Sequence, residues 1–187
     1  MSKTSKMKQS ALIQELITKT EAHIAFARSL TAEKPDLLKK SPPSGGWNVL
    51  QCLEHMNRYD RFYIDECGQK ATQAKKVLAD KVFKTSWLGK LFTKMMLPKK
   101  NMLKMKTFPD KNPKAEEVDE RVLQIFIKQQ KEWLSVLEEA KQVDLNKNRC
   151  NITLPLLSMN LGSSMRFDIY HNERHVAQAK RCLETHR

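Results

Sequence analysis

The chain has 187 residues, 40% of them hydrophobic, and carries a formal net charge of +13. This length predicts a single domain, residues 1–187, large enough to bury a core without disulfides. No stretch approaches the roughly 20 apolar residues of a membrane span, and residues 1–10 lack the apolar centre of a secretory signal. We therefore expect a cytoplasmic protein.

The cysteines argue against a disulfide framework. All four are scattered, with no Cys-x-x-Cys pair: Cys52, Cys67, Cys150 and Cys182. Such a low number of cysteines, without paired spacing, is typical of proteins in a reducing compartment. Cys52 precedes His55 by three residues and Cys182 follows His175 by seven, so each pair shares a helix face. We interpret both thiols as small core residues, with contact to a metal site as the alternative.

The N-terminal region predicts a long helix. Only 5 glycines and 7 prolines are present in the chain, which favours helices over turn-rich β structure. Apolar residues with helical spacing extend over residues 6–30, which predicts the first helix. Prolines and glycines within residues 35–46 then interrupt the pattern.

A capping signal marks the start of a second helix. Asn48 is a favourable N-cap residue, and Gln51 stands three residues later as its capping-box partner. Trp47, just before the cap, can pack onto the first turn. We expect this helix to reach about Cys67 and to end near Gly68, because glycine commonly follows the last helical turn. Further helix over residues 69–82 is the alternative.

Most of the positive charge lies in one segment. Residues 70–114 contain thirteen lysines against two aspartates, which gives +11 of the total +13. Basicity is therefore local, and it does not by itself indicate nucleic-acid binding. We expect short helices joined by loops here, with apolar side chains such as Trp87 packed over the bundle and lysines in water. An acidic or nucleic-acid partner and an anionic membrane surface are the alternatives.

The C-terminal region predicts two more helices. The third covers residues 115–141, with acidic residues in its first turn as the helix dipole favours. Residues 151–157 are expected to be extended. Residues 162–164, Gly-Ser-Ser, offer a cap for a fourth helix over residues 165–184. Four helices with long connections predict an all-α four-helix bundle, with the basic segment between the second and third helices.

Three of the five histidines can converge on one metal ion. His171 and His175 are four residues apart and so share a helix face. His55, on the second predicted helix, can supply a third ligand. Three protein ligands leave one position open, as in catalytic metal sites. The alternative is that these are ordinary core or surface histidines, because a lone His-x-x-x-His pair is weak evidence.

Neighbouring side chains can support such a site. Candidates to orient the imidazole rings lie about one turn from the histidines: Gln51, Tyr59, Asp168 and Gln178. Arg58 and Arg174 are near the histidines and are candidates to bind an anionic substrate, with a solvated or salt-bridged arginine as the alternative for each. The sequence contains no Ser-His-Asp order and no glycine-rich phosphate loop. The catalytic residues and the reaction are therefore unassigned.

Two motifs resemble those of a known family. Trp-Asn-Val-Leu-Gln-Cys-Leu-Glu-His-Met, residues 47–56, is similar to the first signature of the DinB/YfiT-like superfamily. His-Asn-Glu-Arg-His-Val-Ala-Gln, residues 171–178, is similar to the second, His-x-x-Arg-His-x-x-Gln. Order and spacing agree from about residue 5 to residue 184, and the basic segment matches least. The resemblance implies an up-down-down-up bundle and a divalent metal held by His55, His171 and His175.

The resemblance also frames the function. Family members with these histidines are described as metal-dependent hydrolases or as thiol-dependent transferases and isomerases. We expect zinc or nickel, with iron, manganese and copper as alternatives, together with a small-molecule substrate and, for transfer, a low-molecular-weight thiol. A homodimer is one expected assembly. The competing hypothesis is a non-catalytic metal-binding or interaction protein that docks an acidic partner through residues 70–114.

Overall fold

The computed structural model describes residues 7–43, 45–77, 79–97 and 107–186. In chain order its elements are α1 (Gln9–Leu30), α2 (Pro35–Lys39), α3 (Val49–Gln73), α4 (Trp87–Met96), the 3-10 turn η1 (Pro109–Lys111), α5 (Arg121–Ala140), β1 (Arg149–Asn151), β2 (Ser158–Asn160) and α6 (Leu161–Glu184). The prediction of a mostly helical fold is confirmed. None of the described helices is long and apolar enough to cross a bilayer.

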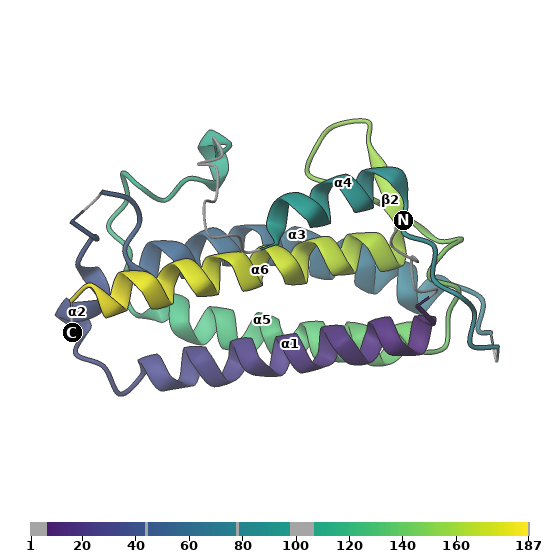
Figure 1. Ribbon diagram of the computed structural model, residues 1–187, viewed down its shortest axis with the longest axis horizontal. Helices are drawn as coiled ribbons and strands as arrows, with labels where there is room; N and C mark the ends of the chain where they lie inside the picture. The colour runs from purple at the N-terminus through teal and green to yellow at the C-terminus, as the bar shows by residue number, and fades with distance from the viewer. Residues whose placement is uncertain (1–6, 44, 78, 98–106, 187) are drawn as a thin grey trace, which may run out of the picture.

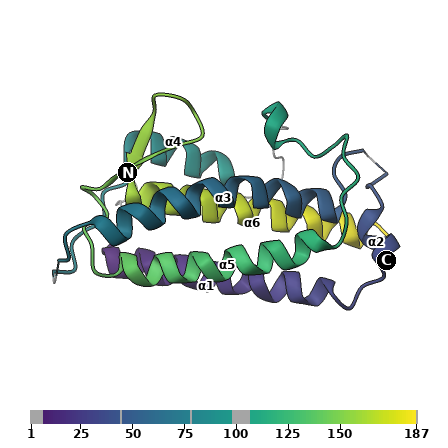
Figure 2. The same cartoon turned by 180° about the vertical axis from the view of Figure 1, so that it is seen from behind.

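The long helices α1, α3, α5 and α6 lie side by side along the molecule (Figures 1 and 2). Both α5 and α6 pack against α3, and both also pack against α1. In Figure 1, α1 and α6 run from right to left, whereas α3 and α5 run from left to right. The long connections therefore leave α3 and α5 parallel, while α6 runs antiparallel to both of them.

The second predicted helix begins as expected and ends later. The Asn48 side chain accepts a hydrogen bond from the Gln51 backbone, and the Gln51 side chain accepts one from the Asn48 backbone, which completes the capping box. The prediction that Gly68 ends this helix is wrong, because α3 continues to Gln73. Gly68 lies inside the helix without a positive φ angle, so it supplies no left-handed cap.

Both C-terminal helices differ from prediction at their starts. α5 begins at Arg121, so the acidic residues expected in its first turn precede the helix instead. α6 begins at Leu161, and its cap is Asn160, whose side chain accepts from the Ser163 backbone at 3.0 Å. The extended residues are β1 and β2, which pair antiparallel. Residues 152–157, predicted to be extended, instead form the loop between them.

Residues 74–120 connect α3 to α5 and contain α4 and η1. The inner face of α4 packs against α6, where Gly89 lies against Ser163. The Ser163 hydroxyl accepts from the Ser86 backbone at 3.0 Å, and the Ser86 hydroxyl caps the helix at Gly89. The prediction that the apolar residues of this segment are packed is wrong for four of them in and just after α4, whose side chains are exposed: Trp87, Leu91, Met95 and Leu97.

Glycine substitutions test how closely α4 packs. A Cβ atom at Gly89 would lie 2.4 Å from the Ser163 Cβ. Gly89→Ala must therefore push α4 away from α6, and we expect it to lower the free energy of unfolding by about 1–3 kcal/mol. Urea denaturation followed by circular dichroism measures this change.

Gly68→Ala is the matched control, because a Cβ there would meet Val136 at an ordinary 3.4 Å. Alanine is the better helix former, so this variant should gain up to about 1 kcal/mol. Equal stability of the Gly89→Ala and wild-type proteins would contradict the close packing of α4.

Candidate metal centre

The bundle core is divided by a buried polar layer. One apolar cluster surrounds Tyr63 and Trp133, and a second surrounds Leu50 and Phe126. All four long helices place buried polar side chains between the two clusters: Thr20, His23, Asn57, Asp60, Gln129, Gln130, Asp168 and Asn172, together with the three histidines. Burying polar groups is costly unless they find partners, so this layer constrains how the helices pack.

The structure brings the three predicted histidines together. His55 comes from α3, whereas His171 and His175 are one turn apart on α6, and all three are buried. One nitrogen atom from each ring lies within 4.8 Å of the other two. The ring centroids are 4.5–4.9 Å apart. Among the described residues, this is the group of histidine, cysteine and acidic side chains with the spacing of a metal site.

Hydrogen bonds set the tautomers of two of these rings. His55 Nδ1 lies 2.7 Å from the Lys111 carbonyl oxygen, and His175 Nδ1 lies 3.0 Å from Gln178 Oε1. Because these oxygens only accept, both Nδ1 atoms carry the proton and both Nε2 atoms keep a lone pair. His55 Nε2 is 3.0 Å from His171 Nε2. His55 and His175 therefore present lone pairs to the cluster, and His55 Nε2 accepts the proton of His171 Nε2. A cation in place of that proton would gain the His171 lone pair as a third ligand.

The environment also keeps the rings neutral. Burial lowers the pKa of His55 to about 4. Burial, together with the neighbouring histidines, lowers the pKa of His171 and of His175 well below the usual value. Neutral imidazole is the form that binds metals. At neutral pH the cluster is therefore ready to bind a cation without first losing protons.

Aromatic side chains surround the cluster. The centroid of the Trp47 ring lies 4.5 Å from that of His55 and 5.6 Å from that of His175. Tyr59 lies 5.1 Å from His55 and 4.5 Å from His171 between ring centroids, close to both rings as the helical spacing predicts. Burial raises the pKa of Tyr59 to about 12, so its phenol remains protonated at neutral pH. An apolar shell of this kind limits the access of water to the histidines.

Residues 109–114, here called the strap, cross over the N-terminal part of α3. Besides the Lys111 carbonyl bonded to His55, the strap receives a hydrogen bond at Asn112 from the Trp47 indole at 3.2 Å. Gln51, predicted to orient a histidine, instead donates to the carbonyls of Pro113 and Lys114 at 3.3 Å. The strap, rather than Gln51, thus orients His55.

The other predicted residues have distinct partners. Gln178 contacts His175, as expected from the spacing. Arg58 forms ion pairs with Glu54 and Glu116, which matches the salt-bridged alternative. Arg174 donates to the Met95 carbonyl at 3.1 Å, and burial lowers the pKa of its guanidinium.

The two cysteines near the histidine motifs lie elsewhere. Cys52 is in the apolar cluster around Leu50, and the Cys182 thiol lies 3.4 Å from the Lys40 carbonyl. Neither belongs to the histidine group within the described parts of the chain.

Asp60 is the centre of the polar layer, and sequence reasoning missed it. Its carboxylate accepts from Gln130 at 2.7 Å, from Trp133 at 2.9 Å and from Asn172 at 2.8 Å. Asp168, predicted to orient His171, faces Asp60 instead. Burial and the Asp60 carboxylate raise the pKa of Asp168 well above its usual range, so Asp168 keeps its proton. Burial also raises the pKa of Asp60, but the hydrogen bonds that it accepts from Asn172 and Trp133 counteract that shift.

Two further contacts of the layer also escaped the sequence analysis. The buried His23 ring lies 3.2 Å from the Glu173 carboxylate, which links α1 to the turn of α6 between His171 and His175. His55 is oriented by the backbone of Lys111, and a backbone acceptor leaves no signal in residue identity. His23 does share the helical spacing of the apolar residues in the first predicted helix, which indicates a buried position but not its partner.

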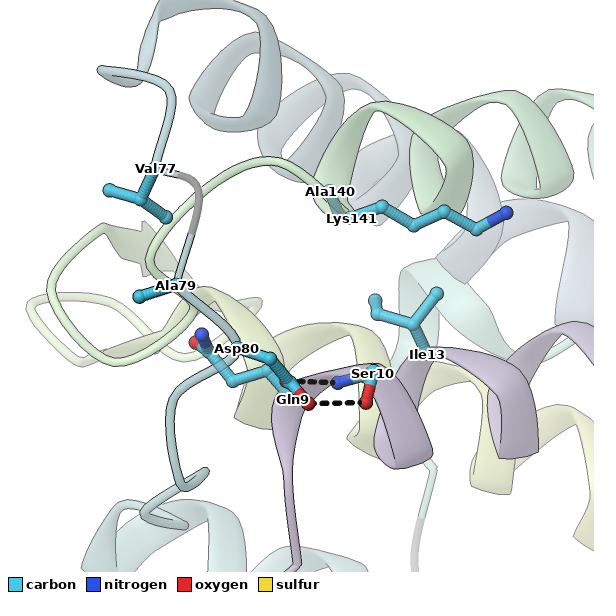
Figure 3. Close-up of a pocket in the computed structure, with 8 residues that line it drawn as sticks. All are labelled: Gln9, Ser10, Ile13, Val77, Ala79, Asp80, Ala140 and Lys141. Carbon is cyan, nitrogen blue, oxygen red and sulfur yellow. Dashed lines mark hydrogen bonds between the residues drawn. The ribbon is translucent and has the colours of Figure 1, made fainter.

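A small pocket elsewhere does not compete with this centre. It has a volume of about 90 Å³ and lies where α1 begins and α5 ends, between Ile13, Asp80 and Ala140 (Figure 3). Asp80 accepts hydrogen bonds there from the Ser10 backbone at 3.1 Å and the Ser10 hydroxyl at 2.8 Å. Its lining contains no histidine. These contacts tie residues 79–81 to the start of α1, which is a structural role.

Comparison with known proteins gives one match. A family model described as the DinB superfamily matches residues 15–179, which include all three histidines. No curated protein and no solved structure matches the chain.

Asp60 offers a test of the polar layer. Asp60→Ala leaves three buried donors on α5 and α6 without an acceptor, and we expect it to lower the free energy of unfolding by about 3–5 kcal/mol. Asp65→Ala on the exposed side of the same helix should change it by less than about 0.5 kcal/mol. Chemical denaturation measures both. A similar small effect for the two variants would show that Asp60 does not organise the layer.

Proposed function

The chain belongs to the DinB superfamily, and from this membership we propose that its long helices form an up-down-down-up four-helix bundle around one divalent metal site. The basic residues 70–114 are an insertion between the second and third helices of that bundle. His55, His171 and His175 are the metal ligands in this proposal. The observation that carries it is the convergence of three buried, neutral imidazoles within 4.8 Å.

The residues fit such an ion. Two nitrogen ligands of a tetrahedral metal, each about 2.0–2.1 Å from it, lie about 3.4 Å apart. The 3.0 Å between the Nε2 atoms of His55 and His171 is close to that separation. Hydrogen bonds at the outer nitrogens of His55 and His175 supply the orientation that metal-bound imidazoles usually have. Imidazole ligands favour zinc and nickel here, with iron, manganese and copper as alternatives.

We propose an enzyme that acts on a small molecule, either a hydrolase or a thiol-dependent transferase. A divalent metal with an open position would lower the pKa of a bound water toward neutrality and would hold a bound thiol as the thiolate. Trp47 and Tyr59 shape the apolar walls on which a substrate would lie. The Tyr59 phenol keeps its proton at neutral pH and serves as a hydrogen-bond donor. A low-molecular-weight thiol is the proposed co-substrate for the transfer reaction.

Metal content tests the ligands. In protein purified without an affinity tag and equilibrated with Zn²⁺, Gln178→Ala should weaken zinc binding by about 10–100-fold, as loss of an outer hydrogen bond typically does. His171→Ala removes a ligand and should cost more. Elemental analysis and zinc titration measure both.

His186→Ala is the matched control, because the His186 ring lies near the C-terminus and bonds to the Ser41 carbonyl, away from the three histidines. It should bind zinc like the wild type. Full zinc occupancy in the His171→Ala protein would reject the proposed ligand set.

An activity screen separates the two reactions. Zinc- and nickel-loaded protein is incubated with activated esters and with small electrophiles, each with and without a low-molecular-weight thiol. Turnover that requires the thiol indicates a transferase, and turnover without it indicates a hydrolase. In either case His55→Ala should abolish turnover, because it removes a ligand. Tight metal binding without any turnover would favour the alternative, a non-catalytic metal-binding or interaction protein.

A further inference from the structure

The outer face of α4 carries an exposed apolar strip. Trp87, Leu91 and Met95 are spaced four residues apart, so they line one face of the helix. Their exposed fractions are 76%, 43% and 39%. Single exposed apolar residues are ordinary on protein surfaces, but a continuous strip that begins with a tryptophan usually marks an interaction surface.

The strip cannot rotate toward the core, because the opposite face of α4 already packs against α6. Gly89 packs against Ser163 so closely that even a Cβ atom would clash. Phe92 packs beside Phe167, with 5.8 Å between ring centroids, and Met96 is buried. The packing of α4 on α6 therefore fixes the exposed strip on the solvent side of the helix.

Positive charge flanks the strip. Lys90 and Lys94 are exposed on one side of it, and exposed Lys84 precedes the helix. In the described parts of the chain these three lysines form no ion pair. Residues 84–97 contain no acidic residue. The strip is therefore bordered by uncompensated positive charge.

A second element adds to the same surface. The loop between β1 and β2 rises beside α4 in both views (Figures 1 and 2), and β2 contacts α4. Leu156 in this loop is fully exposed and has a φ angle of 63°, which is unfavourable for leucine. Residues 149–160 also contain one arginine and no acidic residue. The loop thus holds an apolar side chain in solvent in a backbone conformation that is unfavourable for that residue.

We propose that the outer face of α4 and the Leu156 loop dock onto the surface of an anionic lipid bilayer. Short amphipathic helices with tryptophan, leucine and lysine bind in the plane of the lipid interface. Uncompensated lysines select anionic headgroups. A helix face and a loop tip that protrude separately suit a fluid lipid surface, which requires no shape complementarity. This surface is distinct from the histidine cluster.

Vesicle co-sedimentation tests the proposal. Full-length protein should bind vesicles of equimolar phosphatidylglycerol and phosphatidylcholine, and phosphatidylcholine vesicles much more weakly. Replacing Lys84, Lys90 and Lys94 together by Gln should weaken binding to the anionic vesicles by about fivefold for each charge removed. The combined change Trp87→Ser, Leu91→Ser and Met95→Ser should weaken it by at least about a hundredfold.

Controls separate docking from folding and from metal binding. Ile125→Ser with Lys128→Gln removes an exposed apolar residue and a charge from α5 and should leave vesicle binding unchanged. His171→Ala should also bind vesicles normally, so failure of the proposed metal site would not be mistaken for failure here. An unchanged circular dichroism spectrum and zinc content confirm that the α4 triple variant is folded.

Several outcomes would overturn the proposal. These are equal binding to neutral and anionic vesicles, no binding to either, or a triple variant that binds like the wild type. Binding to polyglutamate or duplex DNA in place of vesicles, lost in the triple variant, would assign the surface to an acidic macromolecule. Dimerisation lost in the same variant, without vesicle binding, would assign it to a second copy of the chain.

Discussion

The relative positions of α3, α5 and α6 depend on the hydrogen bonds that the buried Asp60 carboxylate accepts. It lies on α3 with no exposure to solvent and accepts hydrogen bonds from Gln130 and Trp133 on α5 and from Asn172 on α6. A buried charge of this kind is tolerated only when its partners are all in place. Three helices must therefore meet in one register, whereas apolar contacts alone would permit them to slide or rotate.

This constraint extends to the histidines. Asn172, which binds Asp60, directly follows His171, so the same hydrogen bond that orients α6 also turns His171 and His175 toward α3. Glu173 is held from the other side by His23 of α1. The structural polar layer and the candidate metal centre are thus parts of one network. Substitutions in the layer should therefore disturb the geometry of the histidine cluster even where they contact none of the three histidines.

The basic connection between α3 and α5 contributes at two places. Its strap supplies the carbonyl that orients His55 and the groups that hold Trp47 and Gln51. Earlier in the chain, its helix α4 packs on α6 and leaves Trp87 in solvent. One segment therefore closes the histidine cluster and also forms the surface that we propose docks on lipid. One connection can take on both roles because its two parts contact the bundle at different places.

The sequence by itself determined what depends on local spacing. The helical class follows from the 3.6-residue apolar period, the start of α3 from the Asn48 capping box, and the candidate ligands from two histidines four residues apart and a third on another helix. Only the tertiary structure decided what depends on distant segments. His55 is oriented by the backbone carbonyl of Lys111, which any residue type at that position would supply. Asp168 faces Asp60 rather than His171. The exposure of Trp87 depends on which side of α4 fits the close contact at Gly89. Local patterns determine which face a side chain occupies, but only packing determines what that face meets.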